Sequence, residues 1–294
     1  MDAMDKLYDA VARKGPVCLG LDTALEYLPP QLQKEGHAGI LAYNSALVDG
    51  VLDITACFKV QIAYYEALGL AGLGVYAETL RYIRGKGGLV IGDIKRGDIA
   101  DTASRYAHAH FNGDFEADFV TLSPYMGMDS LEPWLREAAR KGKGAFVLLK
   151  TSNPGAQDFQ YLELKDGGRV YNAVGARLAR LAEAYQGKRG YGLFGAVAGC
   201  TGDAEAAALR EALGGLFFLI PGYGAQGGGA HDAALLLRQG NGGVVNASRS
   251  ILKAWSLGGG AAGEPDIAFA VEAARGAALA MRGAIQKAAA GRHG

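Results

Sequence analysis

The segment GDIKRGDIADT, residues 92–102, holds the densest group of side chains able to do acid–base chemistry. Asp93 and Lys95 are two residues apart, so on an extended strand both would point to the same side. Asp98 follows closely, and Lys59 adds a second ammonium from an otherwise apolar run at 57–61. Two ammonium groups alternating with two carboxylates can move a proton or stabilise a developing charge. Such a set is costly to desolvate, which favours a functional site over its alternative, a structural ion-pair network.

A second group of residues is suited to binding an anion. Residues 221–229 read PGYGAQGGG, and Arg249 follows a separate apolar run near an expected helix start. Glycines let backbone N–H groups approach phosphate oxygens closely, and an arginine can bind two of those oxygens at once. The loop and the arginine together predict a phosphorylated ligand.

Eight short apolar runs are expected to be the buried parallel strands that position these side chains. They lie at 17–22, 57–61, 88–94, 119–124, 145–152, 194–199, 216–222 and 242–248. Segments with helical spacing separate them, and no linker or break in composition divides the chain. The pattern predicts one α/β domain over residues 1–294, a (β/α)₈ TIM barrel with extra N- and C-terminal helices.

The active site of such a barrel lies at the carboxyl ends of the strands. Polar side chains follow most of the predicted strands, so we expect them to converge on one mouth. Besides those named above, they are Asp22, Ser123, Thr151, Ser152 and Ser248.

Composition and motifs exclude several other classes of protein. Thirty Lys and Arg balance 30 Asp and Glu, for a pI near 7.0, which argues against nucleic-acid or membrane-surface partners. No apolar run is long enough to span a bilayer, and the N-terminal stretch lacks the pattern of a signal peptide. The three cysteines lie in apolar runs and predict no disulfides, hence a reducing, cytoplasmic setting. His108 and His110, two apart on an expected helix, do not face each other, and no metal site is predicted.

The motifs resemble those of the orotidine 5'-phosphate decarboxylases, in the longer bacterial branch of that family. The matching segments are GLD (20–22), FK (58–59), DIKRGDI (93–99), KTSNPG (150–155), PGYGAQ (221–226) and NASR (246–249). The resemblance implies a cofactor-free decarboxylation of orotidine 5'-monophosphate (OMP) to UMP in pyrimidine biosynthesis. Asn44 also resembles a family position, with no role assigned to it.

The resemblance also implies a role for each matching residue. Lys95 would be the general acid that protonates C6 of the pyrimidine, with Asp93 holding Lys95 and crowding the substrate carboxylate. Lys59 and Asp98 would complete the catalytic set. The implied substrate contacts are Asp22 and Lys59 to the ribose, Ser152 to the pyrimidine, and Tyr223, Gln226 and Arg249 to the phosphate.

In this family the active site lies at a dimer interface, which implies a homodimer. Asp98, Ile99 and Thr102 would then enter the neighbouring subunit's site. Two alternatives remain open on the sequence: a metal-dependent sugar-phosphate decarboxylase or aldolase of the same barrel superfamily, and a catalytically silent nucleotide-binding barrel. A magnesium site would need carboxylates where the second strand supplies Lys59, and a silent binder would be expected to lose Lys95 or a carboxylate.

Overall fold

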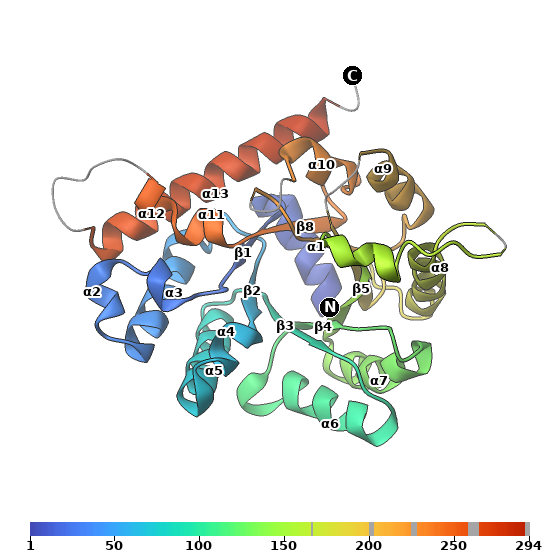
Figure 1. Ribbon diagram of the computed structural model, residues 1–294, viewed down its shortest axis with the longest axis horizontal. Coiled ribbons are helices and arrows are strands. Elements are labelled where there is room, and N and C mark those ends of the chain that lie inside the picture. Colours follow the sequence, from blue (N-terminus) through green and yellow to red (C-terminus); the bar gives the residue numbers. More distant parts are fainter. Residues whose placement is uncertain (166, 200–202, 225–227, 258–264, 292–294) are drawn as a thin grey trace.

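The chain folds into a closed barrel of eight parallel strands surrounded by helices (Figure 1). A computed structural model describes residues 1–165, 167–199, 203–224, 228–257 and 265–291. Each predicted apolar run coincides with a strand to within two residues at either end, so the TIM-barrel prediction is confirmed. The strands are β1 Val17–Gly20, β2 Cys57–Gln61, β3 Val90–Arg96, β4 Phe119–Leu122, β5 Gly144–Lys150, β6 Phe194–Ala198, β7 Phe218–Ile220 and β8 Gly243–Ala247.

Every strand pairs with its neighbour in sequence, and β8 pairs with β1 to close the barrel. The register sets Gly20 beside Lys59, and Gln61 beside Asp93, so the ends of β1, β2 and β3 meet at one rim. Strands covered inside by core side chains and outside by helices must be apolar on both faces. This burial explains why their sequences read as continuous apolar runs.

Helices occupy most of the segments between the strands. They are α1 Ala3–Lys14, α2 Pro30–Gln33, α3 His37–Val51, α4 Ile62–Glu66, α5 Gly69–Gly85, α6 Ala100–Phe111, α7 Glu132–Lys141, α8 Val170–Glu183, α9 Asp203–Ala212, α10 Ala230–Leu235, α11 Arg249–Leu252, α12 Ala254–Leu257 and α13 Ile267–Ala290. The described residues also form short 3₁₀ helices, which are η1 Leu25–Tyr27, η2 Gly113–Phe115, η3 Met128–Leu131 and η4 Pro154–Asp158.

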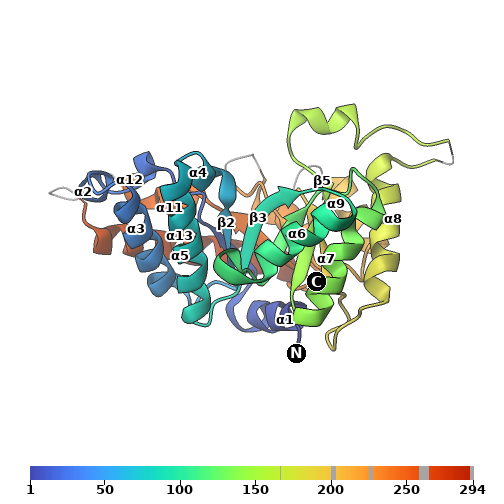
Figure 2. The same cartoon turned by 90° about the horizontal axis from the view of Figure 1, so that it is seen from below.

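The first and last of these helices are the predicted additions to the barrel. Figure 2 shows α1 below the barrel, on the side opposite the segment that follows β5. Met4 and Leu7 of α1 are buried in one cluster with Phe119 and Phe146 of the strands, so α1 closes the amino-terminal end of the barrel. Helix α13 packs along α3 and α10 on the outside. The carboxyl-terminal mouth is left open.

His110 lies in the core between the barrel and α7, where it stacks on Phe115 and Trp134 at centroid distances of 5.9 and 6.4 Å. It is 3% exposed, whereas His108 is exposed, so the two rings do not share a face. Burial, with a smaller contribution from the charge of Arg96, lowers the pKa of His110 to about 4. The ring is therefore neutral in the folded protein at neutral pH.

We expect His110 to make the fold sensitive to mild acid. The unfolded chain binds a proton at this histidine below about pH 6.5, while the folded protein does so only near pH 4. Stability is therefore lost as the pH falls between these values, by up to about 3 kcal/mol. Urea unfolding at pH 7 and 4.5 should show that His110→Phe removes this part of the pH dependence. An equal effect of the control His108→Phe would contradict the assignment.

Other sequence predictions about the core concern cysteine and tryptophan. Cys18 and Cys57 are buried and free, whereas Cys200 lies outside the described residues. Trp134 is 1% exposed, as expected of a packing residue. Among the described residues, no helix is both long and apolar enough to cross a membrane.

Candidate active site

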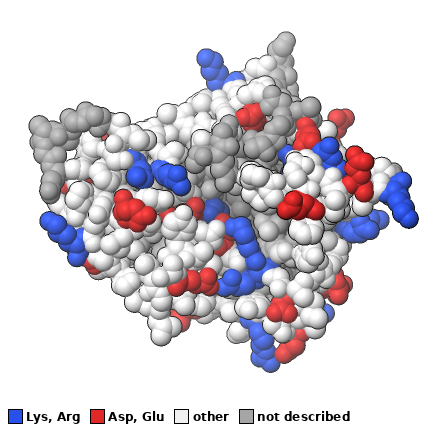
Figure 3. Space-filling model, viewed as in Figure 1, with Lys and Arg blue, Asp and Glu red and all other residues white. Residues whose placement is uncertain are grey.

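A cavity of about 430 Å³ opens at the carboxyl-terminal mouth of the barrel. Residues on or just beyond β1, β2, β3, β5, β6, β7 and β8 line it. The space-filling view into this mouth shows basic and acidic side chains adjoining in the hollow near its centre (Figure 3). Of the predicted site residues, those that line the cavity are Asp22, Lys59, Asp93, Lys95, Ser152, Tyr223 and Arg249.

Four of these side chains form a continuous array of alternating charge. Lys59 Nζ lies 3.1 Å from Asp22 Oδ1 and 2.8 Å from Asp93 Oδ2. Lys95 Nζ lies 2.6 Å from the other oxygen of Asp93. The order is therefore Asp22, Lys59, Asp93 and Lys95. Two cations thus alternate with two anions, and the second carboxylate beside Lys59 within this chain is that of Asp22.

The buried centre of this array is held in its charged form. Burial on its own would lower the pKa of Lys59, but the carboxylates of Asp22 and Asp93 outweigh it and hold the pKa above its ordinary value. Burial would raise the pKa of Asp93, yet Lys59 and Lys95 hold it below the ordinary carboxyl range. Asp93 accepts hydrogen bonds from Lys59, Lys95, Gln61 and Thr121, two on each oxygen. A carboxylate so saturated is fixed in place.

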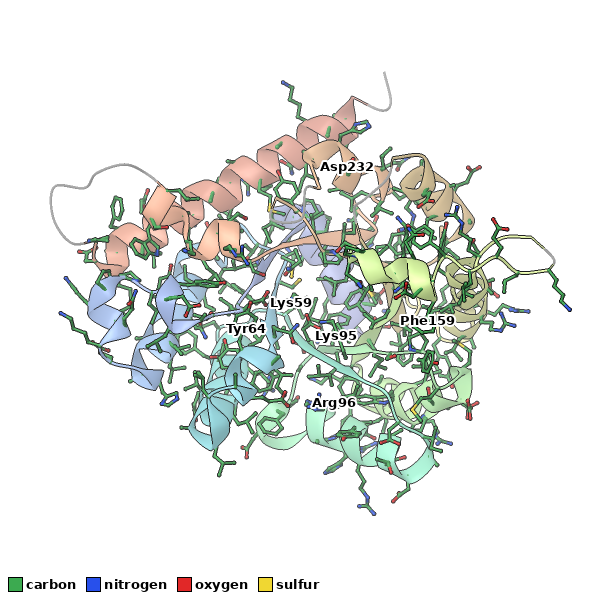
Figure 4. All side chains as sticks on the ribbon, viewed as in Figure 1. Lys59, Tyr64, Lys95, Arg96, Phe159 and Asp232 are labelled. Atoms are coloured by element: carbon green, nitrogen blue, oxygen red, sulfur yellow. The ribbon has the colours of Figure 1, made fainter. Side chains whose placement is uncertain are left out.

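Lys95 differs from the other members of the array in its exposure. Its side chain is 46% exposed, against 6% for Lys59 and 7% for Asp93. Figure 4 places Lys95 beside Lys59 at the centre of the mouth. One ammonium is thus buried as a fixed charge, while the other faces the cavity where a ligand would lie.

Gly20 leaves the space that lets Ser248, just after β8, contact Asp22. A Cβ on Gly20 would lie 2.0 Å from Ser248 Oγ, so any other residue would push Ser248 away. With glycine there, Ser248 Oγ donates to Asp22 Oδ2 at 2.7 Å, and Lys59 holds the other oxygen. The glycine in the GLD segment therefore helps to orient the aspartate that follows it.

The far side of the cavity has the features expected of an anion site. Tyr223 lies on the β7–α10 loop, and Arg249 begins α11 directly after β8, as the sequence predicts. In the described part of the chain, no carboxylate pairs with Arg249, so its guanidinium is available to a ligand. Gln226 lies outside the described residues.

The cavity also contains side chains that the sequence did not single out. Tyr27 of η1 and Tyr64 of α4 line it. The pKa of Tyr64 is raised, mainly by burial and to a smaller extent by the neighbouring Tyr27 and Asp22. Gln61 lines it too, and its Nε2 donates to Asp93 Oδ2 at 3.0 Å. Gln61 is two residues after Lys59 on the same strand, so alternation along β2 could have identified it.

The long segment between β5 and α8 is held to the barrel by hydrogen bonds and ion pairs at several of its residues. Thr151 donates its N–H to Gln160 Oε1 at 2.8 Å, and Gln160 Nε2 donates back to Thr151 Oγ1 at 2.7 Å. Further along, Tyr161 and Arg169 both bond to Glu205 of α9. Figure 2 shows this segment standing above the barrel. It braces the stretch that carries Ser152 into the cavity.

Asp98, Ile99 and Thr102 do not line this cavity. They lie at the rim where β3 leads into α6, and Ile99 is 49% exposed. Asp98 Oδ1 accepts only the N–H of Ile99 among the described contacts. Within one chain Ile99 and Thr102 are exposed and Asp98 is half-buried.

Asn44 is buried in a polar network behind the mouth. Thr23 Oγ1 donates to Asn44 Oδ1 at 2.8 Å, and the Asn44 amide donates to the hydroxyls of Tyr65 and Thr79. Tyr65 in turn donates to the carbonyl of Leu21. The network holds the residues on both sides of Asp22.

Comparisons with known proteins point to one family. Residues 15–257 match the model of the orotidine 5'-phosphate decarboxylase / HUMPS family. The chain is 53% identical over 287 residues to an orotidine 5'-phosphate decarboxylase of Clostridium perfringens, covering 97% of this chain and 98% of that protein. It is 54% identical over 255 residues to the Clostridium tetani protein of the same name, covering 86% and 88%. The solved structure of Leishmania donovani OMP decarboxylase superposes with a TM-score of 0.77 at 30% identity, covering 98% of this chain and 99% of that one.

Proposed function

Because the chain belongs to the orotidine 5'-phosphate decarboxylase / HUMPS family, we propose that it converts OMP to UMP and carbon dioxide in pyrimidine biosynthesis. The proposal includes a mechanism without cofactor or metal, with Lys95 as the proton donor. One observation supports it above all: the array Asp22–Lys59–Asp93–Lys95 lines the cavity and presents its exposed ammonium there.

The chemistry needs a fixed cation at one carbon atom. When the bond from C6 to the carboxylate breaks, carbon dioxide leaves and the electron pair stays on C6. That pair occupies an sp² orbital outside the ring π-system, so the ring cannot delocalise it. The Lys95 ammonium stabilises the pair and then transfers a proton to C6, and the neutral amine regains a proton from water.

Asp93 has two functions in this proposal. Its Oδ1 lies 2.6 Å from Lys95 Nζ and so keeps the ammonium in place before the substrate arrives. Since Asp93 stays ionised, it also lies as a negative charge close to where the substrate carboxylate must bind. Repulsion between the two carboxylates is relieved when carbon dioxide leaves.

Binding energy from the rest of the nucleotide would offset that repulsion. We assign the phosphate to Arg249, Tyr223 and Gln226, and the pyrimidine to Ser152. Asp22 and Lys59 take the ribose hydroxyls. The described members of this set line one cavity, which supports the assignment.

We further propose that the protein is a cytoplasmic homodimer with shared sites. Asp98, Ile99 and Thr102 lie at the rim and do not line the cavity of their own chain, as expected of residues that serve a neighbouring subunit. Other apolar side chains exposed around the same mouth are Tyr125 at 82% and Met126 at 47%. The two free buried cysteines suit a reducing compartment.

Subunit mixing tests the shared site. If Asp98 serves the partner's site, Lys95→Ala and Asp98→Ala should each be inactive as separate dimers. Refolded together at equal amounts, half the dimers are hybrids, each with one native site, so about a quarter of wild-type activity should return. Sedimentation would first confirm that the refolded mixture is dimeric. If that mixture is as inactive as the two separate variants, the site is not shared between subunits.

The metal-dependent alternative meets an obstacle at Lys59. A magnesium ion needs carboxylate oxygens free to coordinate it, but the Lys59 ammonium lies between Asp22 and Asp93, within 3.1 Å of both. Product analysis separates the two functions. We expect UMP from OMP in the presence of EDTA, and no turnover of ketose phosphates with magnesium; the reverse result would favour the sister enzymes.

A further inference from the structure

Strand β3 carries a bulge where it delivers Lys95 to the mouth. Gly92 pairs with Val120 of β4, but the next pair joins Arg96 to Leu122. From one of these pairs to the next, β3 advances by four residues while β4 advances by two. Residues 93–95 of β3 therefore have no regular backbone pairing with β4. Lys95 has a φ of +45°, in the left-handed region that non-glycine residues seldom adopt. Simple alternation along a strand therefore does not determine where Lys95 points.

The hydroxyl of Thr121 on β4 lies inside this bulge. Its Oγ1 accepts the N–H groups of Ile94 and Lys95, each at 3.0 Å, and donates to Asp93 Oδ1 at 2.8 Å. A hydroxyl has one donor and two acceptor positions, so these three bonds use all of them. Thr121 is 1% exposed, so no water competes for those bonds.

We propose that Thr121 is a positioning residue that fixes the Asp93 carboxylate and the Lys95 main chain in one arrangement. This inference rests on the proposed decarboxylation. Thr121 does not line the cavity, so it acts on the substrate only through its neighbours. The one oxygen of Asp93 that holds the Lys95 ammonium is also the oxygen that Thr121 holds. Main chain and side chain of Lys95 are thus tied to the same hydroxyl.

The outer side of the bulge is fixed separately. Arg96 Nη1 donates to the carbonyl of Ile94 at 3.0 Å, and its Nη2 bonds to Glu66 of α4 at the same distance. Figure 4 shows Arg96 on the side of β3 away from Lys59, toward α6. With Arg96 holding Ile94 from outside, Thr121 alone among the described side chains bonds the bulge N–H groups from within the sheet.

Valine at position 121 would keep the shape of threonine and lose all three hydrogen bonds. The N–H groups of Ile94 and Lys95 would then be buried without partners, and the bulge would relax toward a geometry that satisfies them. A displacement of about 1 Å at a catalytic group costs roughly 100-fold in rate. The residues proposed to bind the phosphate, Tyr223 of the β7–α10 loop and Arg249 of α11, belong to other elements of the cavity and would be unaffected.

The test compares Thr121→Val with Thr121→Ser, which restores the hydroxyl. Thr55→Val is the matched control, because Thr55 is equally buried but bonds only to the carbonyl of Val51. We expect Thr121→Val to lower kcat for OMP about 100-fold while KM and the UMP dissociation constant stay unchanged. Thr121→Ser should recover most of the rate, and Thr55→Val should match the wild type. If Thr121→Val does not fold, Thr121→Ala, which also lacks the hydroxyl, replaces it with the same expectation.

The outcomes separate this inference from the function on which it rests. A wild-type protein that does not convert OMP would refute the proposed function itself. An active wild type with full kcat in folded Thr121→Val would overturn the role of Thr121 alone. So would a loss that Thr121→Ser fails to recover, or one that Thr55→Val reproduces.

Discussion

Replacing Lys95 with alanine should lower kcat for OMP by about 10⁴-fold or more while UMP still binds. In the proposed mechanism the variant loses the proton donor and also the cation that stabilises the electron pair on C6, and each of these effects is worth at least about 10²-fold. UMP carries no carboxylate at C6 and should need the ammonium little. The residues proposed to bind it, Arg249, Tyr223 and Ser152, line other parts of the cavity.

This expectation is checked by turnover and by calorimetric titration with UMP. Lys86→Ala is the matched control, since Lys86 also pairs with a carboxylate, Asp49, but is exposed and outside the cavity. The control should keep both rate and affinity. Near-normal turnover by Lys95→Ala would refute its role as proton donor, and loss of UMP binding would mean that the substitution disrupts the whole site.

Replacing Lys59 with methionine should cost both stability and activity. The change leaves Asp22 and Asp93 without the cation they share, and removing one partner of a buried ion pair destabilises by about 3–5 kcal/mol. Freed from Lys59, Asp93 would also turn further toward Lys95 and misplace it. We therefore expect kcat to fall together with the free energy of unfolding.

The stability effect should depend on pH in a defined direction. Asp93 has a native pKa below its unfolded value, so its contribution is present above the unfolded pKa of about 3.9 and is lost as the pH falls through the lower native pKa. Once the Asp93 carboxyl is protonated, it carries no charge for Lys59 to compensate, so removing Lys59 costs less stability. The difference in unfolding free energy between wild type and Lys59→Met should thus be largest near pH 7 and shrink below about pH 4.

Lys143→Met is the matched control for this prediction. Lys143 is also largely buried and bridges two carboxylates, Glu116 and Asp118, but it precedes β5 at the opposite end of the barrel. We expect it to lose stability without losing turnover. If Lys59→Met unfolds at the same urea concentration as the wild type at pH 7, the array does not stabilise the fold as argued.

The barrel and most of its mouth could be predicted from the sequence because both follow from local patterns. Strands covered on both faces read as apolar runs, and residues after those runs must gather at one rim. That reasoning correctly placed Asp22, Lys59, Asp93, Lys95 and Arg249 around one cavity.

What could not be predicted depends on contacts between distant segments. Asp22 joins Lys59 because Gly20 leaves room for Ser248, more than 200 residues away in the chain. The bulge in β3 depends on a hydroxyl supplied by β4, and the alternation argument for Lys95 contains no sign of it. Asp98 was expected beside Asp93 and Lys95 from its place after the strand; within one chain it does not line the cavity, and its proposed role lies in the neighbouring subunit's site.

The decisive measurement is the fall in ultraviolet absorbance when OMP is added to the purified protein in the presence of EDTA. Wild type and Lys95→Ala are measured side by side, with UMP identified as the product. We predict rapid conversion by the wild type in EDTA and none above background by the variant. A folded wild-type protein that leaves OMP unchanged, or a variant that converts it as fast as the wild type, would contradict decarboxylation with Lys95 as the proton donor.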